Sequence, residues 1–175
     1  MGTPELVLVA LPGAEIVWGE RTAGDRAVIR SIPEPASGFH WLDEVRVIPT
    51  PIIDLTIDDV DYPVLPAPEV LEGSGIPTVI AHVACADVLD LTALVDEFDA
   101  QGWRCEDWTG DARVVCSTCM HAETPDPAHR HAGERWFEEH GVAIAGRSSD
   151  AETTLRLWID EAPERRALVD IDEIE

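Results

Sequence analysis

The chain contains no lysine and no asparagine, so its positive charge comes from 12 arginines alone. Aspartate and glutamate number 35, which gives a formal net charge of −23. An acidic surface repels the phosphate backbone, and we therefore expect no nucleic-acid partner. The retention of arginine without lysine indicates a GC-rich genome. The acid excess indicates either a salt-adapted prokaryotic protein or a surface that meets a basic partner.

Long hydrophobic runs are also missing. No stretch approaches the roughly 20 apolar residues of a membrane span, and the apolar run at 6–11 lacks the basic segment that opens a signal peptide. We therefore expect a cytoplasmic protein with no membrane partner, whose thiols are mostly reduced. A hydrophobic content of 45% predicts a packed core.

The pattern predicts an α+β fold that opens with a small β unit over residues 1–48. Four short β-rich runs lie at 5–11, 15–20, 26–32 and 44–48, and turn residues separate them. Short strands of this kind are typical of a compact, barrel-like sheet. Residues 49–75 then hold many prolines and aspartates, which predicts an acidic linker in which 52–57 is compatible with a strand.

Within the first 48 residues stand the segments Glu15-Ile-Val-Trp18, Arg30-Ser-Ile32-Pro33, Ala36-Ser-Gly38 and Trp41-Leu-Asp43-Glu-Val45. They resemble the opening of an uncharacterised bacterial family of small proteins. The resemblance implies a short β unit followed by a ferredoxin-like half. No function transfers from that family, and the cysteines of this chain are not part of its pattern.

Residues 76–162 predict the ferredoxin-like half, a βαββαβ sandwich. We expect a strand at 76–85, a helix at 91–101 with Asp90 as its N-cap, and a hairpin of 103–109 with 112–116 around a Gly110-Asp111 turn. A second helix at 127–140 and strands at 142–145 and 153–159 complete the order. Residues 163–175 are expected as an acidic tail or an additional edge strand.

All four cysteines are candidates for one metal site at an end of this sheet. If the first and third strands are parallel neighbours, Cys85, Cys105, Cys116 and Cys119 meet at one pole. A zinc ion there would take Cys116, Cys119 and two of Cys85, Cys105, His121 and His129. The alternative is that the thiols only pack in the core. A redox Cys-x-x-Cys pair and a Cys105–Cys116 disulfide are less favoured, because the motif closes a strand and the paired strands hold the two Cα atoms at a wide spacing.

Three classes of function remain. The first is a non-enzymatic binding or regulatory module with a small-molecule ligand, a structural zinc as candidate cofactor, and a homodimer contact through the sheet face or the C-terminal segment. The second is a small enzyme with a pocket at the domain junction, in which His40, His82, His121 or His129 acts as acid or base and Cys119 as nucleophile. The third is an acidic mimic of nucleic acid that binds a DNA-binding protein. We adopt the first.

Overall fold

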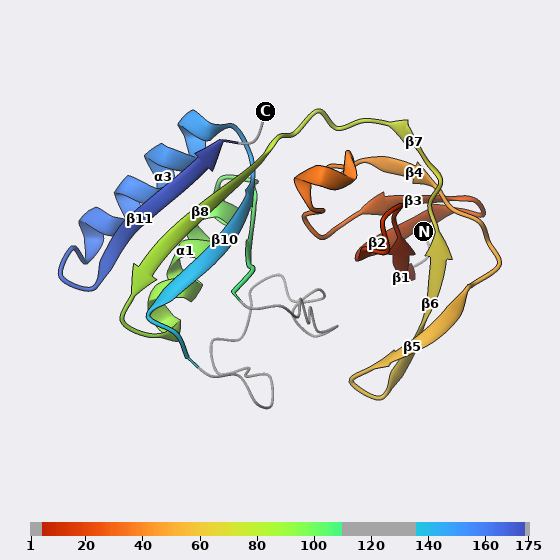
Figure 1. Cartoon of the computed structure of the whole chain (residues 1–175), viewed down its shortest axis with the longest axis horizontal. Coiled ribbons are helices and arrows are strands. Elements are labelled where there is room, and N and C mark those ends of the chain that lie inside the picture. Colours follow the sequence, from red (N-terminus) through yellow and green to blue (C-terminus); the bar gives the residue numbers. More distant parts are fainter. Residues whose placement is uncertain (1–4, 110–135, 174–175) are drawn as a thin grey trace. The chain divides into compact units, whose positions relative to one another are not determined.

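The computed structural model describes residues 5–109 and 136–173. The chain forms two compact units, Met1–Ile76 and Pro77–Glu175, called here the N-terminal and C-terminal units. The fold is α+β, with one β-sheet in each unit and the helices α1 and α3 in the second (Figure 1). The helices of the described residues include none long and apolar enough to cross a membrane.

The N-terminal unit is a seven-stranded sheet in the order β5-β6-β1-β2-β3-β4-β7. Neighbouring strands are antiparallel, except that β1 and β6 run parallel. Val7 and Val9 share one face of β1 and form the core with Ile29 and Leu65. The strands are β1 (Glu5–Ala10), β2 (Ile16–Ala23), β3 (Arg26–Ile29), β4 (Glu44–Arg46), β5 (Ile53–Ile57), β6 (Val60–Pro66) and β7 (Glu69–Glu72), with one 3-10 turn at Pro35–Ser37.

The four strands expected within residues 1–48 are present, but the expected linker at 49–75 is wrong. This segment supplies β5, β6 and β7, and thus both outer strands of the sheet. Its prolines are compatible with pairing because they occupy permissive positions: Pro66 ends β6, and Pro63 faces Asp54 on the outer strand. Asp58 and Asp59, read as linker acids, form the turn between β5 and β6.

The C-terminal unit is a four-stranded antiparallel sheet in the order β11-β8-β10-β9. Both helices pack on one face of this sheet (Figure 1). The core between the layers contains Val83 of β8, Phe98 of α1, Ile144 of β10 and Trp158 of α3, all essentially inaccessible to solvent. The elements are β8 (Thr78–Cys85), α1 (Val88–Ala100), β9 (Arg104–Asp107), β10 (Glu139–Ala145), α3 (Ser148–Glu161) and β11 (Arg166–Glu173).

Helix α1 begins one turn earlier than the sequence predicts. Asp87 is the N-cap, and its carboxylate accepts hydrogen bonds from the backbone N–H groups of Leu89 and Asp90. Asp90, the expected cap, therefore lies inside the first turn and is buried. The helix stops as predicted near Gly102, whose φ of 79° is a left-handed conformation that glycine adopts without strain.

Several expectations for the second half of this unit are wrong. The segment 153–159, expected as a strand, lies within α3, because Ala151, Leu155 and Trp158 recur at helical spacing and all face the core. The fourth strand is instead β11, which agrees with the edge-strand alternative for residues 163–175, and it pairs with β8 of its own chain. The predicted helix 127–140 does not reach His140, since β10 begins at Glu139.

The expected parallel pairing at the centre of the sheet is also wrong. The neighbours of β8 are β10 and β11, and both are antiparallel to it. The second hairpin strand at 112–116, its Gly110-Asp111 turn and most of the predicted second helix lie outside the described residues.

Candidate functional site

One end of the C-terminal sheet brings together an ion-pair network, a cysteine thiol and a buried histidine. Strands β8 and β9 end there, and α1, β10 and β11 begin there. The backbone joins these ends directly: Cys85 N–H donates to the carbonyl of Glu138 at 3.1 Å, and Ala86 N–H donates to that of Arg165 at 3.1 Å. Five chain segments are thus fixed around one short rim.

Asp90 is the centre of a buried ion-pair network on this rim. Its carboxylate accepts hydrogen bonds from Arg166 Nε at 2.9 Å and from Arg165 Nε and Nη2 at 3.1 and 2.8 Å. Arg165 Nη2 also donates to Asp87 at 2.7 Å. Burial raises the pKa of Asp90, but the two guanidinium groups lower it by more, so the net pKa lies below the usual range. The carboxylate is therefore held in its charged form.

The same network ties α3 to the rim. Trp158 Nε1 donates to the backbone carbonyl of Asp90 at 2.8 Å. Arg166 Nη1 donates to the carbonyl of Trp158 at 2.8 Å and to Glu161 at 3.1 Å, and its guanidinium lies 5.2 Å from the Trp158 ring centroid. Every charge in this cluster has a partner, as burial of charges requires.

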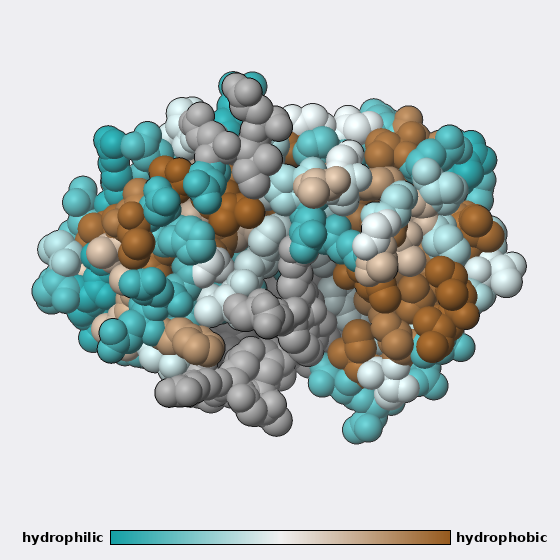
Figure 2. Space-filling view, in the orientation of Figure 1, coloured by the Kyte–Doolittle hydropathy of each residue, from teal (hydrophilic) through white to brown (hydrophobic). Residues whose placement is uncertain are grey.

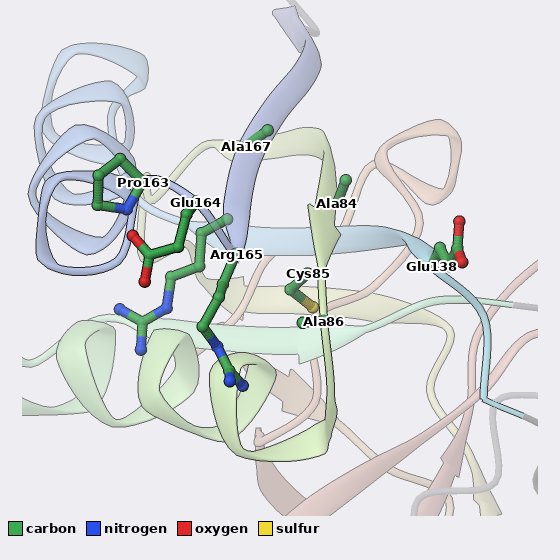
Figure 3. A pocket seen from close by; sticks show the side chains of 9 residues that line it. Ala84, Cys85, Ala86, Glu138, Pro163, Glu164, Arg165 and Ala167 are labelled. Carbon is green, nitrogen blue, oxygen red and sulfur yellow. The ribbon is translucent and has the colours of Figure 1, made fainter.

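A pocket of about 450 Å³ lies beside this network, and we call it the sheet-end pocket (Figure 3). Figure 3 shows the side chains of Glu164 and Arg165 on one side of it, Glu138 on the other, and Cys85 between them. The lining residues are Ala84, Cys85, Ala86, Glu138, Pro163, Glu164, Arg165, Arg166 and Ala167. The walls therefore combine small apolar side chains with charged ones.

The Cys85 thiol is a weak nucleophile in this setting. Burial raises its pKa to about 11, and the negative charges of Asp90, Asp107 and Asp87 act in the same direction. A reactive cysteine needs the opposite environment, one that stabilises the thiolate. At neutral pH this side chain is a neutral thiol that packs with the core.

His140 forms a second polar group at the same end of the sheet. Its Nε2 lies 2.9 Å from the carbonyl of Phe137, which only accepts, so Nε2 carries a hydrogen in this contact. Its Nδ1 lies 3.2 Å from the carboxylate of Asp107 and 3.0 Å from the hydroxyl of Thr109. Burial raises the pKa of Asp107, but hydrogen bonds from His140 and Thr109 more than offset this, and the net pKa is lowered. Both ring nitrogens of His140 are occupied by the protein itself.

The structure places the two described cysteines of the predicted metal site at opposite ends of the sheet. Cys85 lies level with Glu138, at the start of β10, whereas Cys105 faces Ile144, near its end. Six residues of strand at about 3.3 Å each separate these levels, roughly 20 Å. One zinc ion cannot bind both, and the expectation that all four thiols converge is wrong. Among the described residues no group of three or more histidine, cysteine or acidic side chains is arranged to hold a metal. Cys116, Cys119, His121 and His129 lie outside the described residues.

Neither described histidine named as a candidate acid or base lies in the sheet-end pocket. His82 is exposed on the face of β8 opposite the helices. His40 belongs to a turn of the N-terminal unit, where its backbone N–H donates to Asp43 at 2.8 Å. The buried Asp43 carboxylate also accepts from the N–H of Ser74 at 2.7 Å, so this group holds two loops together.

Sequence reasoning missed the residues that organise the site, namely Asp87, Asp90, Arg165 and Arg166, together with His140. The signal that was available is the Arg165-Arg166 pair, two adjacent cations in a strongly acidic segment. Their partner Asp90 lies 75 positions earlier in the chain, a separation that only the sheet topology resolves.

Comparison with known proteins assigns no function to this chain. No family model matches it, and no curated protein matches it. It is similar to a solved structure described as "Novel crystal structure of a hypothetical protein from Neisseria gonorrhoeae", with 15% sequence identity and a TM-score of 0.35 over 99% of this chain and 95% of that one. A similarity at this TM-score does not bear on the fold or the function, which leaves the site geometry as the basis for a proposal.

Proposed function

We propose that the chain is a non-enzymatic binding module whose sheet-end pocket takes a small organic cation, such as a primary amine. The supporting observation is the charge balance of the pocket taken together with the ion-pair network beside it. The two arginines of its wall, Arg165 and Arg166, are already held by the buried network. Glu138 and Glu164 of the lining add to the carboxylates of the network, which already balance these two guanidiniums, and this leaves a surplus of negative charge. An ammonium group complements this surplus, and an anion would be repelled.

The apolar part of the lining suits the rest of such a ligand. Ala84 and Ala86 at the end of β8 and Ala167 of β11 are small side chains, and Pro163 adds a rigid wall. An alkyl chain attached to the ammonium group would bury its surface against them. Recognition would therefore combine charged contacts at Glu138 and Glu164 with a short hydrocarbon segment between them.

Binding is favoured over catalysis because the Cys85 thiol is protonated and the ring nitrogens of His140 already contact other groups of the protein. The Cys85 thiol stays protonated at neutral pH, since its pKa is about 11. The ring nitrogens of His140 contact Phe137, Asp107 and Thr109, so neither is directed at a ligand. An acid or base for catalysis must reach the proton it transfers.

The proposal is tested by calorimetric titration of the full chain with 1,4-diaminobutane, against butane-1,4-diol and succinate as neutral and anionic probes. We expect saturable binding of the diamine alone. The double variant Glu138→Gln/Glu164→Gln should weaken it at least about tenfold, the equivalent of 1.4 kcal/mol. Asp160→Asn, which removes an exposed carboxylate of α3 outside the pocket, should leave it unchanged. Equal binding of diamine and succinate, or equal weakening by both variants, would overturn the proposal.

We further propose that the C-terminal unit is a ferredoxin-like fold and the N-terminal unit a small barrel. The order β8-α1-β9, then β10-α3-β11, with spatial order β11-β8-β10-β9, supports the first. For the second, the N–H of Ile48, just beyond β4, donates to the carbonyl of Pro66 in β6 at 2.9 Å. This bond links two strands that are not neighbours in the sheet order, as closure into a barrel requires.

A structural zinc ion remains a proposal for the same end of the C-terminal unit. Cys116, Cys119, His121 and His129 belong to the segment that follows Thr109 and precedes Trp136, and both of these residues lie at that end. Cys85 lies there too and is a compatible third thiol, whereas Cys105 is not. Zinc would favour the thiolate form that Cys85 otherwise avoids.

A further inference from the structure

Strand β5 is an outer strand of the N-terminal sheet that lacks the protection found on other outer strands. In β7 the residue Leu71 is bulged out of the register with β4, and in β11 the residue Val169 is bulged out of the register with β8. Bulges of this kind, like lysine or proline, prevent another chain from adding to an edge. Strand β5 pairs with β6 over five consecutive residues without a bulge, and it contains no proline, arginine or lysine.

The register shows which backbone groups of β5 face away from the sheet. Asp58 and Asp59 form a two-residue turn with φ values of 52° and 62°, the geometry of a type I′ hairpin. The flanking pair of such a hairpin is hydrogen-bonded, so Ile57, Leu55 and Ile53 direct their backbone groups toward β6. Asp54 and Thr56 therefore direct their N–H and C=O groups outward. The position of Pro63 opposite Asp54 agrees with this, because proline has no N–H to give to that pair.

The two faces of this hairpin differ sharply in polarity. On one face, Ile53, Leu55 and Ile57 lie opposite Val64, Tyr62 and Val60. Tyr62 is buried and packs edge-on against Trp18, with 4.7 Å between the ring centroids. In contrast, Ile53 and Val60 are 54% and 48% exposed. Figure 2 shows hydrophobic surface gathered over the part of the N-terminal unit where β5 and β6 run.

The opposite face of the hairpin carries acids. Asp54 and Thr56 of β5 lie there with Asp61 of β6, and Thr56 donates a hydrogen bond to Asp61 at 2.6 Å. Between Arg46 and Arg104 the sequence has no arginine or lysine at all. A strand added to β5 would thus meet an apolar row on one face and a negatively charged row on the other.

We infer that β5 is a docking edge for an extended segment of another protein in which apolar residues alternate with arginine or lysine. Such a segment would bond to the outward N–H and C=O groups of Asp54 and Thr56 and continue the sheet, the mode called β-augmentation. Its apolar side chains would cover Ile53, Leu55 and Ile57, and its cations would lie beside Asp54. A second copy of this chain fits less well, because it would bring four more aspartates to the same edge and carries a charge of −23.

The test uses the full chain and a fluorescent nine-residue peptide in which lysine and valine alternate, followed by fluorescence anisotropy. Two control peptides keep the length: one groups the same lysines and valines into separate blocks, and one replaces lysine by glutamate. We expect binding of the alternating lysine peptide only, and weaker binding at 0.5 M than at 0.05 M NaCl. Equal binding of the block peptide would show that charge alone acts and would overturn the proposal.

Two variants locate the contact. Thr56→Pro removes one outward N–H without removing a bond to β6, and Thr56→Val keeps that N–H; both lose the hydrogen bond to Asp61. We expect at least tenfold weaker peptide binding to Thr56→Pro than to Thr56→Val. If Thr56→Pro is unfolded by circular dichroism, Asp54→Lys decides instead, and it should transfer binding from the lysine peptide to the glutamate peptide. Equal affinities of Thr56→Pro and Thr56→Val for the lysine peptide would overturn the proposal, and so would the absence of peptide binding to the wild type. A wild-type dimer that Thr56→Pro dissociates in sedimentation would overturn it in favour of a second copy of the chain.

Discussion

Replacing Asp90 by asparagine should separate the buried ion-pair network from the rest of the fold. The substitution keeps the shape of the side chain and removes the charge that faces Arg165 and Arg166. Arg166 is only 10% exposed, and its remaining carboxylate, Glu161, is 68% exposed. Breaking a buried pair from one side costs about 3–5 kcal/mol. Because Arg165 is 42% exposed and can regain water, we expect a smaller loss of about 2–3 kcal/mol.

The assay is urea denaturation monitored by hydrogen exchange in peptides covering 151–161, so that the C-terminal unit is followed by itself. Asp87→Asn is the matched control, because asparagine is also a good N-cap and Asp87 loses only an exposed contact with Arg165. We expect this control to have a small effect. Equal destabilisation by the two variants would refute the reasoning that burial of Asp90, rather than its position in the first turn, sets the cost.

The pH dependence of the same comparison provides a second check. The pKa of Asp90 is lowered in the folded chain, so its stabilising effect is present above the unfolded pKa and is lost as pH falls through the folded pKa. The stability difference between wild type and Asp90→Asn should be constant from about pH 5 to 8 and shrink below about pH 4. A difference that grows on acidification would contradict the assigned charge state.

Three further predictions concern other parts of the chain. Gly19→Ala should destabilise the N-terminal unit by about 1–3 kcal/mol, because the added Cβ would lie 2.6 Å from the buried Val9 Cγ2. The control Gly24→Ala should be nearly neutral, because no atom lies within 4 Å of its Cβ. Equal effects of the two variants in urea denaturation would contradict the packing argument. Thermal stability should rise between 0.05 and 1 M NaCl, because salt screens the net charge of −23. A gain of about 1 kcal/mol would raise Tm by about 2–4 °C. A Tm that stays flat or falls over this range would refute the screening argument. Protein purified without chelator should contain about one zinc ion per chain. The variant Cys105→Ser should retain this zinc, and the variant Cys116→Ser should lose it. A wild-type protein without zinc and with four titratable thiols would exclude the metal site.

Local patterns were sufficient for elements whose burial alternates or recurs cleanly. Strands β1 to β4, β8 and helix α1 follow from spacing and turn residues, with small errors at their ends. The segment 153–159 misled because Thr153, Thr154 and Ile159 are β-branched, a composition typical of strands. The helical spacing of Ala151, Leu155 and Trp158 overrides this preference, since it buries three side chains on one face.

The candidate site was less predictable than the fold because its contacts join distant parts of the sequence. A local window shows Asp90 as a helix cap and Arg165-Arg166 as surface charges in a tail. Their pairing depends on β11 lying beside β8, which in turn depends on α3 being a helix. The wrong prediction of a strand at 153–159 therefore misplaced the fourth strand, and the ion-pair network of Asp90 could not be predicted. The predicted convergence of the four cysteines assumed a parallel pairing at the centre of the sheet, whereas β8 and β10 are antiparallel.

The distribution of arginine connects the two proposed binding surfaces. Nine arginines lie in the described part of the chain, and eight of them form ion pairs with its carboxylates. Positive charge is thus used to fix the structure, and the remaining acids set the potential that a ligand meets. If the acids serve only salt adaptation, added salt should raise stability and no cation should bind specifically. If they also select cationic partners, salt should raise stability while weakening both the diamine and the peptide contacts. Opposite salt dependences of folding and binding in one preparation would separate these two roles.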